Sequence, residues 1–189
     1  MPNPKIIVTG GAGFIGSHTV VELVEHGYEP VVVDDFSNSA RSVLDGLAAI
    51  CGRPIRCHEL DCTDRAGLER VLRQEGEVAG VIHFAASKAV NESLQKPLLY
   101  YRNNLGGLIA VLEAMLAEGV RDLVFSSSCT VYGQPEKLPV TESTPIAPAS
   151  SSSSTATASS TAPSSRCRSP SRHPPASRRT PSSGSPRCW

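Results

Sequence analysis

The chain alternates between short runs of apolar residues and longer segments in which apolar side chains recur every three or four positions. The short runs are rich in β-branched residues and read as buried strands. The longer segments have the period of amphipathic helices, and Gly27 is a plausible end for the first of them. The expected strands are residues 5–9, 30–33, 55–60, 80–84 and 122–126, and the expected helices are residues 14–26, 41–50, 65–74 and 105–117.

The strands are expected to be apolar throughout. A sheet with one solvent-exposed face would instead show alternating apolar and polar residues. Apolar strands of this kind, alternating with helices, are typical of a parallel sheet covered on both faces. The sequence therefore predicts a Rossmann-like, doubly wound α/β fold that stops after about five strands. A P-loop fold is the alternative, but the first loop lacks the lysine and Ser/Thr that a P-loop needs.

The chain changes character at Ala149. Fifteen of the last 41 residues are serine, and this segment contains no Leu, Ile, Val, Phe, Met or Lys. Such a composition cannot bury enough apolar surface to offset its ordering entropy. We therefore expect an incomplete dinucleotide-binding domain over residues 1–148 and a disordered Ser/Pro/Arg-rich tail over residues 149–189.

Charge follows the same division, because the net charge of zero averages two unlike parts. Residues 1–148 carry all 18 acidic residues and 12 basic ones, a formal charge of −6, whereas residues 149–189 carry six arginines, +6. The acidic part gives no reason to expect nucleic-acid binding. A basic tail that binds RNA or acidic partners remains an alternative, although regular Arg-Ser repeats are absent.

The six cysteines have no paired spacing, so neither a metal site nor a disulfide framework is expected. No apolar stretch approaches the length of a membrane span, and the first apolar run ends in glycines rather than in a signal-peptide cleavage site. The favoured expectation is a cytoplasmic protein with reduced thiols and no membrane contact.

The first segment with chemical meaning is Gly10-Gly11-Ala12-Gly13-Phe14-Ile15-Gly16, between the first strand and the first helix. Gly10 permits a tight turn, Gly13 lets the backbone approach a pyrophosphate, and Gly16 allows close packing of helix and strand. The helix N-terminus offers free N–H groups and a positive dipole end to phosphates. In this strand–turn–helix context, the glycine spacing indicates a dinucleotide site.

Two acidic positions follow later strands. Asp34 ends the second strand, where a carboxylate accepts hydrogen bonds from an adenosine ribose and repels a 2′-phosphate, so NAD is favoured over NADP. The alternative for Asp34 is a turn cap, which Asp35 or Ser37 could also supply. Asp61, followed by Cys62, stands where an acid can bind the adenine amino group. It could equally cap the next helix, in competition with Thr63 and Asp64.

Small and hydroxyl-bearing residues follow the last two strands. After His83 come Phe84, Ala85, Ala86, Ser87 and Lys88, where small side chains let the backbone pass close to a cofactor. Lys88 could neutralise a phosphate or remain a solvated surface lysine. His83 is expected to be a packed core residue. Ser126, Ser127 and Ser128 lie where ligands bind in open α/β sheets, without the partners of a serine hydrolase.

Four stretches together carry a family resemblance over about the first 148 residues. They are IIVTGGAGFIGSHTVVEL, VVVDDFSNS, VIHFAASKAVNESLQKPLLYYRNNLGG and LVFSSSCTVYGQP. On these, the chain resembles the extended short-chain dehydrogenase/reductase family, and within it the NAD-dependent UDP-glucose 4-epimerases. Two residues depart from the family's sequence pattern: Ala86 stands where a glycine is common, and Cys129 stands where alanine is usual.

The resemblance implies an isomerase of galactose metabolism that interconverts UDP-glucose and UDP-galactose through a 4-keto intermediate, and a homodimer when intact. Ser128 would hold the sugar 4-oxygen, and Lys88 would contribute to both cofactor and substrate binding. The implied cofactor contacts are Gly10, Gly13, Phe14, Ile15, Gly16, Asp34, Asp35, Phe36, Ser37, Asn38, Ser39, Asp61, Cys62, Phe84, Ala85, Ala86, Ser87, Lys88 and Asn103.

The family's catalytic Tyr-x-x-x-Lys pair is absent. By the family's spacing it falls near position 154, where the chain has serines, and no Tyr follows Tyr132 and no Lys follows Lys137. A coding string for Tyr-Gly-Asn-Ser-Lys-Gln-His-Cys-Ala-Glu, shifted by one base, reads as residues 155–163. We therefore expect a frameshift near codons 149–154 and an inactive chain. A non-catalytic NAD-binding fragment and another nucleotide-sugar epimerase or dehydratase are the alternatives.

Overall fold

The computed structural model describes residues 2–133 and 138–146, and the expected tail at 149–189 lies outside them. The described residues fall into two compact units that divide after Ser128. The first unit contains strands β1 (Lys5–Thr9), β2 (Glu29–Asp34), β3 (Arg56–Glu59), β4 (Val78–His83) and β5 (Leu123–Phe125). Its helices are α1 (Phe14–Glu25), α2 (Ser42–Cys51), α3 (Arg65–Glu75), α4 (Val90–Gln95), α5 (Pro97–Tyr100), a π-helix at Tyr101–Leu105 and α6 (Gly106–Ala117).

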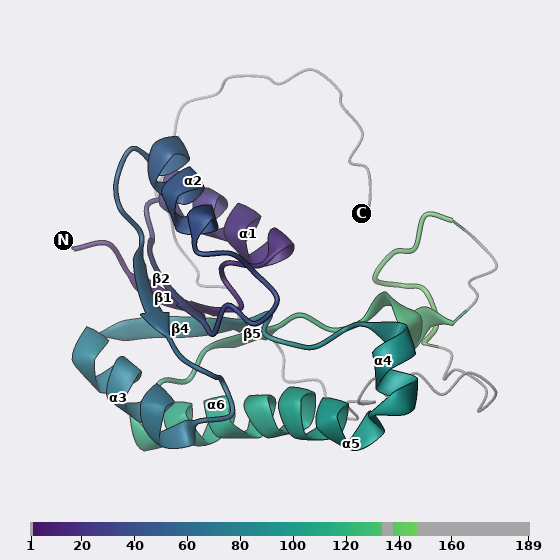
Figure 1. Ribbon diagram of the computed structural model, residues 1–189. Coiled ribbons are helices and arrows are strands. Elements are labelled where there is room, and N and C mark those ends of the chain that lie inside the picture. Colours follow the sequence, from purple (N-terminus) through teal and green to yellow (C-terminus); the bar gives the residue numbers. More distant parts are fainter. Residues whose placement is uncertain (1, 134–137, 147–189) are drawn as a thin grey trace. The chain divides into compact units, whose positions relative to one another are not determined.

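All five strands form one parallel sheet in the order β3-β2-β1-β4-β5. The chain builds outward from β1 to β3 on one side, then crosses back to β4 and β5 on the other. Helices α1 and α2 cover one face of the sheet, and α3 and α6 cover the other (Figure 1). This is the doubly wound α/β arrangement that the sequence predicted.

Alternate residues of the central strands supply two separate cores. Ile7, Val31 and Val81 pack against α3 and α6 on one face. Val8 and Val32 pack against α1 and α2 on the other. Because both faces are covered, the middle positions of these strands are apolar whichever face they point to, which is why the strands read as continuous runs.

The expectation that every strand is apolar throughout is wrong for β3. This strand reads Arg-Cys-His-Glu, and its Arg56 and Glu59 are exposed. The physical reason is its place: β3 pairs only with β2 and so forms an outer edge, where charged side chains reach solvent. Its position in the sheet nevertheless agrees with the strand expected at residues 55–60.

The segment between β4 and α6 contains helical structure that the periodicity did not predict. Helices α4 and α5 are only six and four residues long, and a π-helix joins α5 to α6. Pro97 starts α5 at a position where its missing N–H costs nothing. Elements this short have no measurable hydrophobic period, so the sequence pattern could not reveal them.

The β5 side of the sheet exposes apolar surface. Val124 is 56% exposed, and β5 pairs only with β4 among the described residues. Helix α6 buries Val111 and Met115 in the core, yet leaves Ile109 and Leu116 exposed on its other side. In the second unit, the described residues include a 3₁₀-helix at Cys129–Tyr132.

Candidate functional site

The carboxyl ends of β1, β4 and β5 lie side by side. Thr9 pairs with His83, and His83 pairs with Phe125. The strand order changes direction between β1 and β4, so the segments that leave these strands turn toward opposite faces of the sheet. Open α/β sheets bind their ligands at such a switch point. The predicted cofactor segments after β1 and β4 therefore meet at the carboxyl end of the sheet, which we call the carboxyl edge.

The glycine turn after β1 is packed too closely for side chains. Gly10 has φ +68°, and a Cβ on it would lie 2.8 Å from the Ala85 backbone nitrogen. A Cβ on Gly16 would lie 2.2 Å from the carbonyl oxygen of Gly10. The sequence did not assign a role to Gly11, whose Cβ would meet the Val32 side chain at 2.9 Å. The turn is thus locked between the first helix and the loop after β4.

The first turn of α1 offers backbone donors. Its N-cap is Gly13, which has no side chain to bond with the N–H groups of the first turn. A Cβ on Gly13 would have one close neighbour, the Gly10 carbonyl oxygen at 3.1 Å. Phe14 and Ile15 in this turn are exposed. A helix N-terminus with uncapped N–H groups and a positive dipole end is suited to hold phosphate oxygens.

Asp34 joins the glycine turn to the loop after β2. Its Oδ2 accepts a hydrogen bond from Ala12 N at 3.0 Å. Its Oδ1 accepts from Phe36 N at 3.0 Å and from the Ser39 hydroxyl at 2.8 Å. The structure therefore confirms the turn cap, and the ribose role of Asp34 stays a prediction. Two carboxylate oxygens offer about four acceptor sites, so these three donors leave room for another.

The loop that follows Asp34 has an unusual backbone. Phe36 has φ +57°, which is uncommon for a residue other than glycine. The guanidinium of Arg41 lies over its ring, 4.7 Å from the centroid. Asp35 Oδ1 accepts from Ser37 N at 2.9 Å, and the next residue, Asn38, is exposed. The predicted contact segment 34–39 is therefore an ordered turn and not an open strand end.

The competition for the cap of α3 is decided in favour of Asp64, whose Oδ1 accepts from Gly67 N at 3.0 Å. Asp61 instead accepts from Thr63 N at 2.7 Å. Cys62 is mostly buried beside the core. Burial, assisted by the negative charge of Asp61, raises the pKa of its thiol to about 12. Cys62 is therefore a neutral thiol packed against the core beside α6, and its role as a cofactor contact stays a prediction.

His83 is a core residue, as expected. It is 2% exposed, and its Nδ1 lies 2.7 Å from the Thr9 hydroxyl. Burial lowers the pKa of His83 to about 4, so the ring is neutral at pH 7. A neutral imidazole that is already hydrogen-bonded holds the ends of β1 and β4 together.

Two asparagines of the π-helix hold the loop after β4. Asn104 Oδ1 accepts from Ser87 N at 2.8 Å, and Asn104 Nδ2 donates to Ser87 O at 2.9 Å. Asn103 Nδ2 donates to the Ser87 hydroxyl at 3.1 Å. The structure therefore brings the predicted residues Asn103 and Ser87 together, while Asn104 was missed. Lys88, next in the loop, is exposed.

The serines after β5 extend the same edge. Ser126 N donates to the carbonyl oxygen of His83 at 3.2 Å, which continues the ladder between β4 and β5 by one residue. Ser127 is exposed and Ser128 is half-buried. Ser128 therefore lies on the β5 side of the edge. The position near 154, where the family's tyrosine and lysine are expected, lies outside the described residues.

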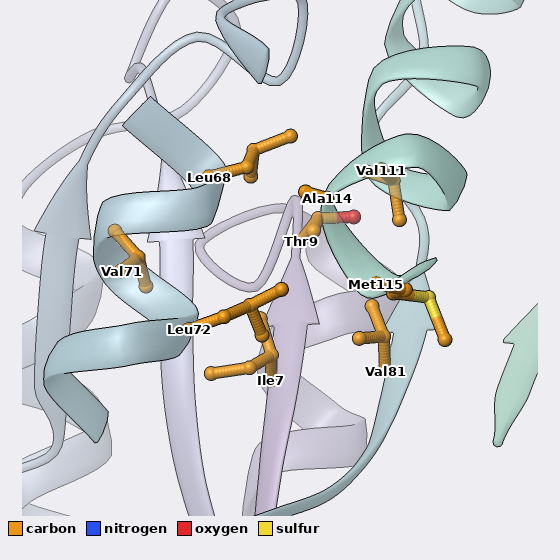
Figure 2. Close-up of a pocket in the computed structure, with 9 residues that line it drawn as sticks. All are labelled: Ile7, Thr9, Leu68, Val71, Leu72, Val81, Val111, Ala114 and Met115. Carbon is orange, nitrogen blue, oxygen red and sulfur yellow. The ribbon is translucent and has the colours of Figure 1, made fainter. Parts of the chain in front are cut away.

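Two hollows lie elsewhere in the first unit. One is a cavity of about 10 Å³ between the sheet and helices α3 and α6. Figure 2 shows Ile7, Leu72, Val81 and the other core side chains that line it. It holds about one water-sized sphere and has an apolar lining, so it is a packing void. A second hollow lies between α1 and α2 and is lined by residues such as Val21 and Leu47. Neither is built from the predicted cofactor residues.

Residues 2–133 and 138–146 contain neither a metal-binding cluster nor a membrane-spanning helix. No group of three or more His, Cys, Asp or Glu side chains in this part could hold a metal ion. Its cysteines at positions 51, 57 and 62 are free thiols. None of its helices is long and apolar enough to cross a bilayer.

Comparison with known proteins agrees with this geometry. The model of the NAD dependent epimerase/dehydratase family matches residues 6–158. The UDP-glucose 4-epimerase of Bos taurus is 52% identical over 147 residues, covering 75% of this chain and 42% of the relative. That of Bacillus subtilis (strain 168) is 51% identical over 141 residues, covering 75% of this chain and 41% of the relative.

Solved structures give the same result. The UDP-glucose 4-epimerase from Bifidobacterium longum in complex with NAD⁺ and UDP has a TM-score of 0.70 and 45% identity, covering 76% of this chain and 42% of that one. The enzyme from Stenotrophomonas maltophila with bound NAD and formylated UDP-arabinopyranose has a TM-score of 0.71 and 43% identity, covering 77% and 43%. The chain thus spans about two-fifths of the length of these relatives, and with its glycine turn and switch-point edge it belongs to the NAD dependent epimerase/dehydratase family.

Proposed function

We propose that the described part of this chain is the NAD-binding part of a UDP-glucose 4-epimerase. The observation that carries the proposal is the uncapped first turn of α1, where Gly13 leaves space beside the backbone N–H groups and Asp34 lies next to the turn. The family match and the relatives crystallised with NAD support it. The cofactor supplies a reversible hydride acceptor in such an enzyme.

Each predicted segment then has a task in holding the dinucleotide. The turn from Gly10 to Gly16 binds the pyrophosphate through backbone N–H groups. Asp34 uses its remaining acceptor site for a hydrogen bond from a ribose hydroxyl. The loop 35–39 surrounds the adenosine. Asp61 and the Cys62 backbone lie on the adenine side, and the loop 84–88 with Asn103 lies on the nicotinamide side.

The carboxylate of Asp34 predicts a preference between the two nicotinamide cofactors. A 2′-phosphate at the ribose would meet a charge already held in place by three donors. The chain should therefore bind NAD⁺ at least tenfold more tightly than NADP⁺ in parallel calorimetric titrations. Equal affinity for both cofactors would contradict the ribose role of Asp34.

The substrate of the intact family member is a UDP-hexose of galactose metabolism, with Ser128 on the sugar 4-oxygen and Lys88 near the phosphates. This polypeptide of 189 residues lacks Tyr-x-x-x-Lys: none of its four tyrosines has a lysine four positions later. Losing a positioned acid–base group costs about 10²–10⁴ in rate. These 189 residues should therefore give no measurable interconversion of UDP-glucose and UDP-galactose, and turnover by purified material would refute this.

The origin of the missing pair has a direct test at the level of the gene. We propose that the text after codon 149 is read in a shifted frame, since a shift of one base converts an epimerase-like string into residues 155–163. The nucleotide sequence around codon 150 decides this. Epimerase-like text in the neighbouring frame supports the shift, and its absence excludes it.

We further propose that the intact protein is a cytoplasmic homodimer that binds no nucleic acid. Helix α6 supports the dimer, because it is apolar on two sides and a helix of that kind is normally buried all round. Its exposed row is Ile109, Leu112 and Leu116. A charged substitution at Leu116, which is 81% exposed, should shift the intact protein toward monomer in sedimentation velocity. An unchanged dimer would place the interface elsewhere.

A further inference from the structure

The loop after β4 leaves the sheet immediately after one backbone bond. Phe84 N donates to the carbonyl oxygen of Thr9 at 3.0 Å, and the chain then runs along the edge as far as Lys88. Three of its residues are small or hydroxylic, so their side chains contribute little packing that could fix its path. The contacts that fix this loop must therefore come from elsewhere in the chain.

We propose that Asn104 is the positioning residue for this loop, and that it sets the loop's cofactor-binding geometry by pairing with the backbone of Ser87. The inference rests on the proposed function, because that function makes residues 84–88 a cofactor contact. Asn104 is not among the residues that the resemblance implies. It acts through the loop and not on the cofactor itself.

The pairing uses both the acceptor and the donor of a primary amide. The side-chain oxygen of Asn104 accepts from Ser87 N, and its nitrogen donates to Ser87 O, at 2.8 and 2.9 Å. This reproduces the two bonds that a neighbouring strand would make with a single residue. Asp would keep an acceptor and lose the donor, and Ala would lose both, so the position demands an amide of this length.

The π-helix explains how two consecutive side chains reach one residue. In the π-helix Tyr101–Leu105, the turn is wider than in an α-helix, so neighbouring side chains diverge less. Asn103 Nδ2 donates to the Ser87 hydroxyl and to Asn104 Oδ1, both at 3.1 Å. Within the described part of the chain, the Asn103 bonds all use Nδ2, which leaves its Oδ1 for a ligand. The two asparagines thus divide the work: Asn104 positions the loop, and Asn103 can contact the cofactor.

The same pairing controls the glycine turn. The Ala85 backbone lies against Gly10, where a Cβ would be only 2.8 Å from Ala85 N. Ala85 lies two residues before Ser87, so a shift at Ser87 changes the gap between the loop and the phosphate-binding turn. Displacements of about 1 Å in such a site can cost up to about 10²-fold in function.

The test replaces Asn104 in the full 189-residue chain and measures two quantities. Hydrogen exchange of the Ser87 amide reports whether the loop is held, and NAD⁺ calorimetry reports whether its geometry serves the cofactor. Asn104→Ala should accelerate Ser87 exchange at least tenfold and raise the NAD⁺ Kd about tenfold. Asn104→Asp retains the bond to Ser87 N, so it keeps the proposal testable if the alanine variant fails to fold. It should raise the Kd without fully exposing the amide.

Three further variants separate positioning from mere destabilisation. Asn91→Ala, on an exposed position of α4, should change neither quantity. Glu75→Gln, at the opposite edge of the sheet, should lower stability and leave the NAD⁺ Kd unchanged. Asn103→Ala should raise the Kd while Ser87 exchange stays slow.

Two results would overturn the role of Asn104. The first is Ser87 exchange that stays slow in Asn104→Ala. The second is fast exchange with an unchanged NAD⁺ Kd. Failure of the unsubstituted chain to bind NAD⁺ would instead reject the proposed function and, with it, the cofactor role of this loop. The Ser87 exchange of the variants would then still show whether Asn104 holds the loop.

Discussion

The two ends of the parallel sheet, where its strands begin and where they finish, differ in how their polar groups are paired. The amino edge is the end where the strands begin, and the carboxyl edge is the end where they finish. At the edge formed by the strands' amino ends, the Glu75 carboxylate is 5% exposed and lies among three cationic or proton-donating side chains. Lys5 Nζ is 3.3 Å from Oε2, His58 Nε2 is 2.8 Å from Oε1, and Arg56 also binds Oε2. At the carboxyl edge, the first turn of α1 and the side chain of Lys88 face solvent.

This contrast indicates that the amino end of the sheet contributes to stability, whereas the carboxyl end keeps exposed groups for the proposed cofactor. Burial alone would raise the pKa of Glu75, but the hydrogen bonds from His58 and Lys5 and the charge of Arg56 outweigh it and lower the pKa. A carboxylate with this many partners has little hydrogen-bonding capacity left for a ligand. Substitutions at the amino edge should therefore change unfolding and not NAD⁺ binding. Exposed positions at the carboxyl edge should do the reverse.

Gly16→Ala should have the largest effect, because it breaks the carboxyl edge itself. The new Cβ would lie 2.2 Å from a backbone oxygen that cannot move without the whole turn. We expect a loss of about 3 kcal/mol or more in the free energy of unfolding, the upper range for overpacking. Urea denaturation measures it. A loss below about 1 kcal/mol would show that the turn is not rigid.

Acidification should have the next largest effect, because His83 at the carboxyl edge and Glu75 at the amino edge should lower stability in different pH ranges. The pKa of His83 is about 4 when folded and about 6.5 when unfolded, so the unfolded chain binds a proton first as the pH falls. Stability should therefore be complete above pH 6.5 and fall by about 2–3 kcal/mol between pH 6.5 and 4. The lowered pKa of Glu75 adds a loss below about pH 4.3, its unfolded value. Urea midpoints at half-unit pH intervals check both windows.

Glu75→Gln should remove the lower of these two windows and leave the upper one. We expect about 2 kcal/mol of destabilisation at pH 7, less than for a fully buried pair because Lys5, Arg56 and His58 are partly exposed. NAD⁺ affinity should not change. A fall in NAD⁺ affinity would show that the amino and carboxyl ends of the sheet are coupled.

Lys88→Ala should show the reverse pattern at the carboxyl edge. The side chain is exposed, so the free energy of unfolding should stay within about 0.5 kcal/mol of the unsubstituted value. The NAD⁺ Kd should rise severalfold, because a cation near the bound dinucleotide is lost. Lys96→Ala is the matched control, since Lys96 is exposed and pairs with Glu92 in the adjoining helix α4. An equal effect from both lysines would reject a specific role for Lys88.

Gly46→Ala should have the smallest effect and the opposite sign. Gly46 lies inside α2, and a Cβ there would meet nothing within 4 Å. We expect a gain of about 0.5–1 kcal/mol in the free energy of unfolding, from the lower chain entropy of the unfolded state. The opposite signs at positions 16 and 46, seen in the same urea experiment, would show that packing and not glycine content controls the turn.

Local patterns predicted most of the sheet and the glycine turn. Gly10 and Gly16 were assigned their roles from spacing alone, because the turn's constraints act over a few residues. The single polar strand, β3, departs from expectation because its place at the edge depends on the strand order of the whole sheet. The cap of α3 had three candidates within four residues, and only the backbone path selects Asp64.

Asn104 could not be found from the sequence. Its contact with Ser87 spans 17 positions and depends on a π-helix of five residues. No periodic pattern announces such a helix, and Asn103 and Asn104 are identical in type.

The most direct test of the account is a calorimetric titration of the 189-residue chain with NAD⁺, after circular dichroism has established that it is folded. We expect saturable binding at one site per chain, weakened by Lys88→Ala and unaffected by Glu75→Gln. A folded chain that takes up no NAD⁺ would show that the carboxyl end of this sheet is not a dinucleotide site.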